Sequence, residues 1–339
     1  MHKFSYLFIC CSLLLVVFAE QNTRKVIMTV QGPVSAKQVG ITLSHEHLLV
    51  DFIGADSTGY SRWDRKKVLE KVLPYLEQIK DFGVKTFVDC TPAFLGRDPW
   101  LLRELSEKSG IHILTPTGYY GAYANKFVPQ YAFEMSAEEL AELWIAEFES
   151  GIEGTDVRPG IIKIAVERGD SLSGMHKKIV KAAAITHLAT GLTIVSHTGP
   201  EPPAYEQIAL LEAMGVAPEA FVWTHAHEGT MEAHIELAQK GVWISLDKMN
   251  NKQETVDLMV DLLRNLKLHN LLDKVLISHD AGWYKPGEPD GGFFRGFTSI
   301  FSHLLPALRE NGFNDADIDL ILVKNPQKAF SIDIRKVES

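Results

Sequence analysis

The sequence predicts a (β/α)₈ barrel, and three observations support this fold class. Eight short segments rich in β-branched and apolar residues alternate with longer segments that have helical periodicity. Several of the short segments are continuous apolar runs, which is typical of parallel strands covered on both faces. Glycine follows most of the helical segments, where it commonly ends a helix.

The strand candidates begin near residue 39. Runs such as Ile161-Ile162 and Val275-Leu276-Ile277 show no polar alternation. The eight candidates are Val39–His45, Thr86–Thr91, His112–Gly118, Gly160–Val166, Thr193–His197, Phe221–His225, Val242–Leu246 and Lys274–Asp280.

Seven segments between the strands have an apolar face at helical spacing, as Val68, Val72, Leu76 and Ile79 show in the first of them. They are Arg65–Phe82, Ala137–Glu149, Lys177–Thr190, Ala204–Met214, Met231–Gln239, Glu254–Leu266 and Gly296–Glu310. A doubly wound open sheet would normally have a glycine-rich turn after its first strand. Ser44-His45-Glu46-His47 stands there instead, so a barrel formed by one domain over residues 20–339 is the simpler reading.

The first residues predict a signal peptide over residues 1–19. Lys3 precedes an apolar run from Leu7 to Phe18, and Ala19 offers a small-residue cleavage site. The run is shorter than the roughly 20 residues of a membrane-spanning helix. We therefore expect export to the periplasm or the medium, without stable membrane insertion after cleavage. An uncleaved anchor and lipid attachment at Cys10 or Cys11 are the alternatives.

Charge and cysteine content limit the possible partners. The net charge of −9 and the lack of Lys/Arg clusters argue against nucleic acid or an anionic membrane surface as a partner. After cleavage only Cys90 remains, so the mature chain can form no internal disulfide. Cys90 ends an apolar run and is expected to be buried.

Metal-binding side chains stand at the carboxyl ends of the predicted strands, which meet at one mouth of a barrel. Nitrogen and carboxylate ligands without thiolates suit zinc, with cobalt, manganese or iron as alternatives. More than four ligands indicate two divalent ions, because one tetrahedral zinc needs fewer. The candidate ligands are His45, His47, Lys163, His197, His225 and Asp280.

Lys163 is the unusual member of this set, because apolar residues flank it on both sides. Burial near dications disfavours its ammonium form. The neutral amine can react with CO₂ to give a carbamate (N6-carboxylysine), whose two oxygens are able to bridge two metals.

These residues resemble the phosphotriesterase family of the amidohydrolase superfamily, including its lactonase-like branch. The matching segments are Thr42–His47, Gly160–Ala165, Val195–Thr198, Thr224-His225, Ile277–Asp280, Thr117–Tyr120 and Leu322–Phe330. The resemblance implies that His45, His47 and Asp280 hold the more buried metal. His197 and His225 then hold the more exposed one, carboxylated Lys163 bridges both, and a hydroxide between the ions is the nucleophile. Asp280 accepts the proton released during attack, and a homodimer is expected.

Two departures from the family concern the substrate. Asp247-Lys248 stands where the triesterase branch has Asp-His and the lactonase branch has Asp-Arg. Lys248 could pair with Glu228 in a proton relay, contact Tyr120, or be a solvated surface lysine.

The loop Ala281–Phe294 also departs from the family pattern. Trp283, Tyr284, Phe293 and Phe294 could form an apolar wall for the substrate, although packing accounts equally well for the last two. Tyr120 matches a tyrosine that lies against the lactone ring oxygen in the lactonase branch.

The leading prediction is a hydrolase that acts on a lactone or carboxyl ester and has phosphotriesterase side activity. The assigned residues are Asp280, Tyr120 and Lys248 for catalysis, and Tyr120, Trp283, Tyr284 and Lys248 for binding a small-molecule ester. An organophosphate triester hydrolase (aryldialkylphosphatase) is the alternative. Two minor alternatives are a non-catalytic metal-binding barrel and a single-metal, deaminase-like barrel.

Overall fold

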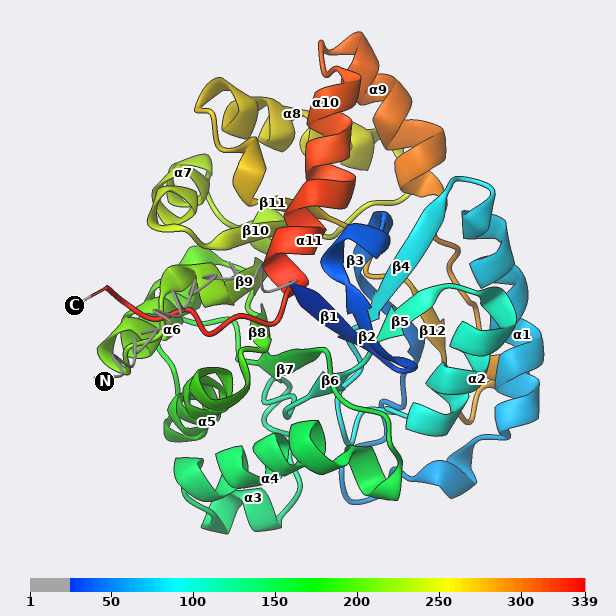
Figure 1. Ribbon diagram of the computed structural model, residues 1–339, viewed down its shortest axis with the longest axis vertical. Coiled ribbons are helices and arrows are strands. Elements are labelled where there is room, and N and C mark those ends of the chain that lie inside the picture. The colour runs from blue at the N-terminus through cyan, green and yellow to red at the C-terminus, as the bar shows by residue number, and fades with distance from the viewer. Residues whose placement is uncertain (1–24, 339) are drawn as a thin grey trace, which may run out of the picture.

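A computed structural model describes residues 25–338 of the chain (Figure 1). The predicted signal peptide, residues 1–19, lies outside the described residues. Within the described part, no helix combines the length and apolar character needed to cross a membrane.

The structure confirms the (β/α)₈ barrel: parallel strands surround the centre and helices form the outer ring (Figure 1). The predicted third strand is interrupted at Thr115 and is therefore present as two short strands, β5 and β6. The barrel strands are β3 (Ile41–Leu49), β4 (Val84–Asp89), β5 (His112–Leu114), β6 (Pro116–Thr117), β7 (Ile161–Ala165), β8 (Thr193–His197), β9 (Phe221–Thr224), β10 (Trp243–Leu246) and β11 (Val275–Ile277).

Each of the seven predicted helical segments contains a helix. In the last of them, Gly296–Glu310, residues 296–298 are not helical, and a π-helical turn, Ile300–Leu304, precedes α9 (Leu305–Glu310). The helices are α1 (Arg65–Lys80), α2 (Pro99–Ser109), α3 (Tyr131–Glu134), α4 (Ala137–Ser150), α5 (Gly174–Thr190), α6 (Glu201–Ala213), α7 (Met231–Lys240), α8 (Gln253–Leu268), α9 (Leu305–Glu310), α10 (Asp315–Asp319) and α11 (Asn325–Phe330).

Helix α2 is missing from the segments expected from sequence, although its end signals are present. The Asp98 side chain accepts from Leu101 N at its start, and Gly110 ends it with a positive φ of 72°. Both features are typical helix boundaries.

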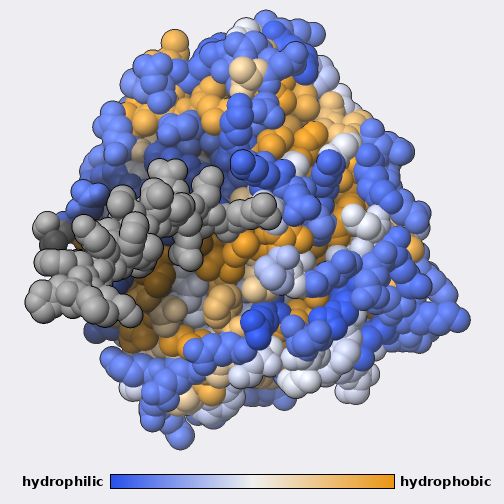
Figure 2. Space-filling model, in the orientation of Figure 1, coloured by the Kyte–Doolittle hydropathy of each residue, from blue (hydrophilic) through white to orange (hydrophobic). Residues whose placement is uncertain are grey.

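The base of the barrel is closed by an antiparallel hairpin of β1 (Val26–Thr29) and β2 (Gly32–Ser35) together with α11 (Figure 1). One hydrophobic cluster joins Ile27 of the hairpin and Phe330 of α11 to barrel residues such as Val195 and Trp243. Cys90 is buried in this cluster and is a free thiol, as expected. On this face, hydrophobic side chains gather near the barrel centre and hydrophilic ones surround them (Figure 2).

The barrel closes between β11 and β3 through side chains more than through a regular ladder. Ser44 Oγ donates to Ile277 O at 3.0 Å, and Ser278 Oγ accepts from His45 N at 3.0 Å. Asp280 N donates to His45 O at 3.1 Å. These bonds set the position of the segment after β11 against β3.

A further strand, β12 (Gly282–Tyr284), lies in the loop that the sequence predicts as irregular. It pairs in parallel with the end of β3, with Gly282 opposite His47 and Tyr284 opposite Leu49. Gly282 has a φ of 95°, and a Cβ there would lie 1.9 Å from His47 O. Only glycine permits this close approach of the two backbones.

Glu46 also connects β3 to the segment after β11 from inside the protein; we call this junction the seam. Its fully buried carboxylate accepts from Ser278 Oγ at 2.7 Å, His279 Nδ1 at 2.6 Å, His279 N at 3.0 Å and Ala281 N at 2.9 Å. Because all four of its partners belong to the segment after β11, Glu46 joins the first barrel strand to the last.

This geometry predicts that Glu46→Gln destabilises the fold by about 3 kcal/mol or more, the cost of breaking a buried ionic network. The new amide nitrogen would place N–H donors either against the N–H donors of His279 or against that of Ala281, depending on which oxygen it replaces. Urea denaturation measures the loss. As a control, Glu70→Gln removes only an exposed contact with Lys66, 3.9 Å away, so its change should stay within about 0.5 kcal/mol. Equal effects of the two substitutions would contradict this role of Glu46.

Candidate metal centre

All six predicted metal ligands line one cavity of about 360 Å³ at the carboxyl end of the barrel strands. They reach it from β3, from the middle of β7, from the end of β8, and from the residues that follow β9 and β11. The six are His45, His47, Lys163, His197, His225 and Asp280. The structure thus brings together every residue of the predicted ligand set.

One group consists of His45, His47 and Asp280, whose donor atoms all lie within 4.8 Å of one another. Asp280 Oδ1 is 3.2 Å from His47 Nε2 and 3.9 Å from His45 Nε2. His47 Nδ1 is hydrogen-bonded to Thr91 Oγ1 at 2.8 Å, which directs Nε2 toward the cavity.

The second group consists of His197 and His225, with 2.7 Å between His197 Nδ1 and His225 Nε2. Lys163 is fully buried, and its Nζ lies 3.3 Å from His45 Nε2. Together with burial, its positive charge lowers the pKa of His45 and His197, as expected for a position among the histidines.

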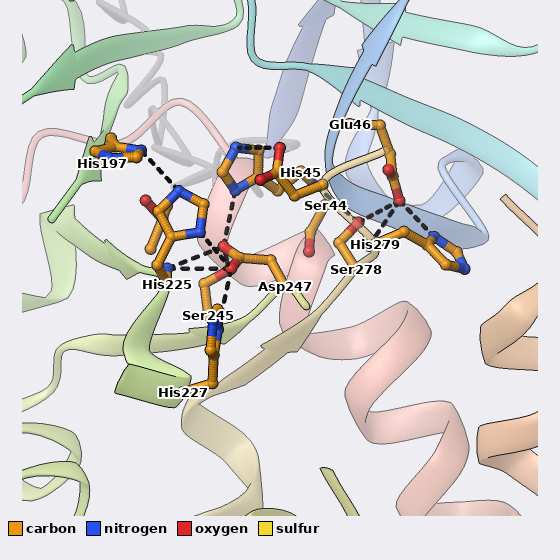
Figure 3. A network of polar contacts seen from close by, with 12 residues as sticks. Ser44, His45, Glu46, His197, His225, His227, Ser245, Asp247, Ser278 and His279 are labelled. Atoms are coloured by element: carbon orange, nitrogen blue, oxygen red, sulfur yellow. Dashed lines mark hydrogen bonds and ion pairs between the residues drawn. The ribbon is translucent and has the colours of Figure 1, made fainter. Parts of the chain in front are cut away.

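Asp247 holds members of both groups (Figure 3). Its Oδ2 is 2.8 Å from His45 Nδ1, and its Oδ1 is 2.8 Å from His225 Nδ1. His225 N and Ser245 Oγ also donate to this carboxylate, which is fully buried. Asp247 therefore fixes the ring orientation of His45 and His225, and directs the Nε2 atom of each away from itself.

The electrostatic environment keeps the donors in metal-binding protonation states. Burial, with the charge of Lys163, lowers the pKa of His45 to about 4. Burial and His225 hold the pKa of His197 well below its usual value. Burial would raise the pKa of Asp280, but the hydrogen bond from His47 and the nearby imidazoles outweigh it and lower the pKa. At neutral pH the site thus offers neutral imidazoles at His45 and His197 and an ionised Asp280.

His225 differs from the other two histidines. Burial lowers the pKa of His225, but the charge and hydrogen bond of Asp247 outweigh burial and raise it. Asp247 itself has a pKa well below its usual value, because His225 and His45 together outweigh the effect of burial.

Two of the candidate ligands have strained backbone. His225 and Asp280 have φ angles of 57° and 49°, in the left-handed region that non-glycine residues seldom adopt. Bonds from His225 N to Asp247 and from Asp280 N to His45 O hold these conformations. Strain of this kind costs of order 1 kcal/mol or more and clusters at functional sites.

The donor set fits divalent cations. Imidazoles and a carboxylate without a thiolate suit zinc and related ions. In His45, His47 and His225 the second ring nitrogen is already held by a carboxylate or a hydroxyl, the arrangement usual for metal-binding histidines. Among the described residues, the carboxylate-containing triads that could hold an ion are His45–His47–Asp280 and His45–His225–Asp247.

Three of the four predicted substrate-binding residues also line the cavity: Tyr120, Trp283 and Lys248. The Tyr120 ring is 5.1 Å from the His197 ring, and the Trp283 ring is 6.3 Å from the His47 ring, measured between centroids. Lys248 follows β10 and is exposed.

The prediction for Tyr284 is wrong, because this side chain does not line the cavity but packs in the main hydrophobic core. Successive residues of a strand face opposite sides, so Trp283 of β12 faces the cavity and Tyr284 faces away. Phe294 packs in the core against Tyr75 and Phe297, while Phe293 is 81% exposed. Neither phenylalanine lines the cavity.

The proposed pair of Lys248 with Glu228 is not formed. Glu228 Oε1 accepts from Arg168 at 2.6 Å instead. Within residues 25–338, the Lys248 side chain forms neither an ion pair nor a hydrogen bond, so it is not hydrogen-bonded to Tyr120.

Sequence reasoning missed the roles of Asp247 and Arg168. Asp247 directly follows β10, so the strand-end rule that identifies the other ligand candidates also applies to it. Arg168 lies in the loop after β7, and no sequence spacing indicates its contact with Glu228, which is 60 residues away.

The comparisons with known proteins agree with this geometry. A model of the phosphotriesterase family matches residues 25–330. The aryldialkylphosphatase of Saccharolobus solfataricus is 30% identical over 315 residues, covering 88% of this chain and 97% of that protein. The N-acetyltaurine hydrolase of Salmo salar is 26% identical over 345 residues, covering 89% and 97%.

The organophosphorus hydrolase from Deinococcus radiodurans has a similar structure, with a TM-score of 0.80 and 28% sequence identity. The match covers 91% of this chain and 97% of that one. Since the family model covers almost all described residues and the barrel carries the resembling motifs at one mouth, the chain belongs to the phosphotriesterase family.

Proposed function

We propose that this protein is a two-metal hydrolase that cleaves a lactone or a carboxyl ester. The observation that carries the proposal is the convergence of four histidines, Lys163 and Asp280 on one cavity. His45, His47 and Asp280 would hold one cation, and His197 and His225 the other. Carboxylated Lys163 would contribute to both sites.

Two divalent cations, zinc by preference, activate water and polarise the scissile bond when bound. Carboxylation of Lys163 joins its neutral amine to CO₂ with release of one proton. The product is an anion with two oxygens, which suits a buried position between cations better than an ammonium.

The chain's own residues would orient the substrate and move the proton. Asp280 is ionised and lies at the cavity, so it can accept the proton that the attacking water loses. The buried Tyr120 ring would lie against the substrate beside His197. Burial raises the pKa of Tyr120 well above its usual value, so the phenol keeps its proton and can donate a hydrogen bond to a substrate oxygen.

An organophosphate triester is the second candidate substrate. The aryldialkylphosphatase and organophosphorus hydrolase relatives support it, and a tetrahedral phosphorus resembles the transition state of lactone hydrolysis. The N-acetyltaurine hydrolase relative adds an amide as a bond to test. Homodimer formation and export stay predictions.

Substrate choice is tested by kcat/KM at saturating Zn²⁺ or Co²⁺. The panel contains γ- and δ-lactones, acyl-homoserine lactones, aryl carboxyl esters, an N-acyl amide and a dialkyl aryl phosphate. We expect lactones to exceed the phosphate by a hundredfold or more, about 2.7 kcal/mol of transition-state discrimination. The opposite ranking would favour the triester hydrolase. Two bound ions without any turnover would favour the non-catalytic barrel.

Lys163→Ala should lose most of the metal and activity, because it removes the group proposed to join the two sites. Elemental analysis should give two ions per chain in the wild type, and one would contradict the two-metal account. Added propionate should restore part of the activity by replacing the carbamate. Lys181→Ala, at an exposed position on α5, is the control and should keep both ions. Full activity of Lys163→Ala without propionate would exclude the bridging role.

Asp247→Asn should weaken metal retention by about 10- to 100-fold, the usual effect of losing the partner of a metal-binding histidine. An asparagine oxygen can accept from only one of the two Nδ1 groups, and its amide opposes the other. Competition with a chromogenic chelator measures the change. Asp261→Asn, which removes an exposed pair with Arg264 on α8, is the control. Equal metal retention in both variants would show that Asp247 does not position the histidines.

A further inference from the structure

The cavity beside the candidate metal centre has two walls of opposite character. The apolar wall consists of Val50, Phe52, Leu95, Tyr120, Tyr123 and Trp283. Most of it belongs to a separate hydrophobic cluster at the mouth, in which Val50, Leu95 and Tyr120 are buried and Trp283 packs on them. This wall therefore offers a preformed apolar surface.

The other wall is polar and consists of Arg168, Glu228, Lys248 and Asn250. The chain topology separates the two walls. The apolar residues follow β3, β4, β6 and β11, whereas the polar residues follow β7, β9 and β10. Around a closed barrel these are two contiguous halves, so the walls face one another across the metal ligands.

The charged side chains around this cavity have polar partners, with one exception outside the ligand set. Arg168 pairs with Glu228 at 2.6 Å. The Arg295 guanidinium donates to the carbonyls of His279 and Asp280, both at 2.8 Å, and lies over the Trp283 ring. Lys248 has no such partner among the described residues. An exposed ammonium on a cavity wall is thus available to a ligand.

Lys248 is also held at this place by its surroundings. Asn250 Nδ2 donates to Lys248 O at 3.3 Å, and Asn250 Oδ1 accepts from Lys252 N at 2.9 Å. The preceding residue, Asp247, is fixed among the histidines. The backbone of Lys248 is therefore tied to the metal-binding end of β10, and its side chain belongs to the same cavity.

We propose that the substrate has an apolar acyl arm and, on the other side of the scissile bond, an anionic group that Lys248 binds. The acyl arm lies on the wall of Tyr120 and Trp283. The anion is a sulfonate, carboxylate or phosphate. This inference rests on the proposed ester hydrolysis and adds the substrate class to it.

Two esters with the same acyl chain provide the test. One is 2-sulfonatoethyl hexanoate, and the other is the neutral 2-methoxyethyl hexanoate. With the zinc-loaded wild type, the ratio of kcat/KM values should favour the sulfonate by about tenfold, mainly through KM, as expected for a charge-assisted contact. Carboxymethyl and 2-phosphatoethyl hexanoate then identify the preferred anion.

Lys248→Met should abolish this preference, because it keeps the chain length and removes the charge. Lys248→Arg should retain it. Lys252→Met, whose lysine lies on the same loop and is 70% exposed, should leave both rates unchanged. A sulfonate preference that persists in Lys248→Met would overturn the inference.

Calorimetric binding of hexanesulfonate gives a readout that does not depend on turnover. Its Kd should rise about tenfold in Lys248→Met, in line with the loss of one charge-assisted contact. If no ester is hydrolysed but binding still depends on Lys248, the proposed function fails and the anion site stands. If the neutral ester is hydrolysed and binding is the same in both proteins, the anion site fails and the function stands.

Discussion

The closure of the barrel between its first and last strands is the constraint on which the site depends. His45 and His47 stand on β3, and Asp280 stands in the segment after β11. Their contacts, such as the 3.2 Å between His47 Nε2 and Asp280 Oδ1, exist only if this seam is in register. Buried Glu46 fixes the register with four hydrogen bonds to the far side.

Burying two carboxylates at one end of a barrel destabilises the folded state unless hydrogen bonds or ion pairs satisfy each of them. Glu46 and Asp247 both meet this condition, and both accept from groups on other strands or on the segments that follow them. A slip of one residue between strands would leave these charges without partners. The polar networks in Figure 3 therefore select one strand arrangement, and the same arrangement aligns the donor nitrogens of His45 and His225.

The sequence predicts the strand ends well because apolar runs and their terminal polar residues are local patterns. The positions of His45, Lys163, His197 and Asp280 follow from those patterns alone, and the structure places all of them on one cavity. The role of Tyr284 could not be predicted in this way. It depends on the pairing of β12 with β3, and that pairing decides which of two adjacent aromatic residues faces the cavity. The pair of Arg168 and Glu228 likewise depends on loops that meet only in the folded chain.

The topology of the barrel also explains why substrate orientation and metal binding are linked. Most of the ligands stand at or after the carboxyl end of a strand, and the residues that follow these strands form the nearest part of the wall. Trp283 lies three residues after Asp280, and Lys248 directly follows Asp247. The backbone that orients a donor atom therefore also orients a wall residue. The loops after the neighbouring strands β11, β3, β4 and β6 carry the apolar wall residues, and the loops after β7, β9 and β10 carry the polar ones. The apolar and polar halves of the wall therefore lie on opposite sides of the same ligands. A substrate that satisfies both halves has its scissile bond between them, where those ligands converge.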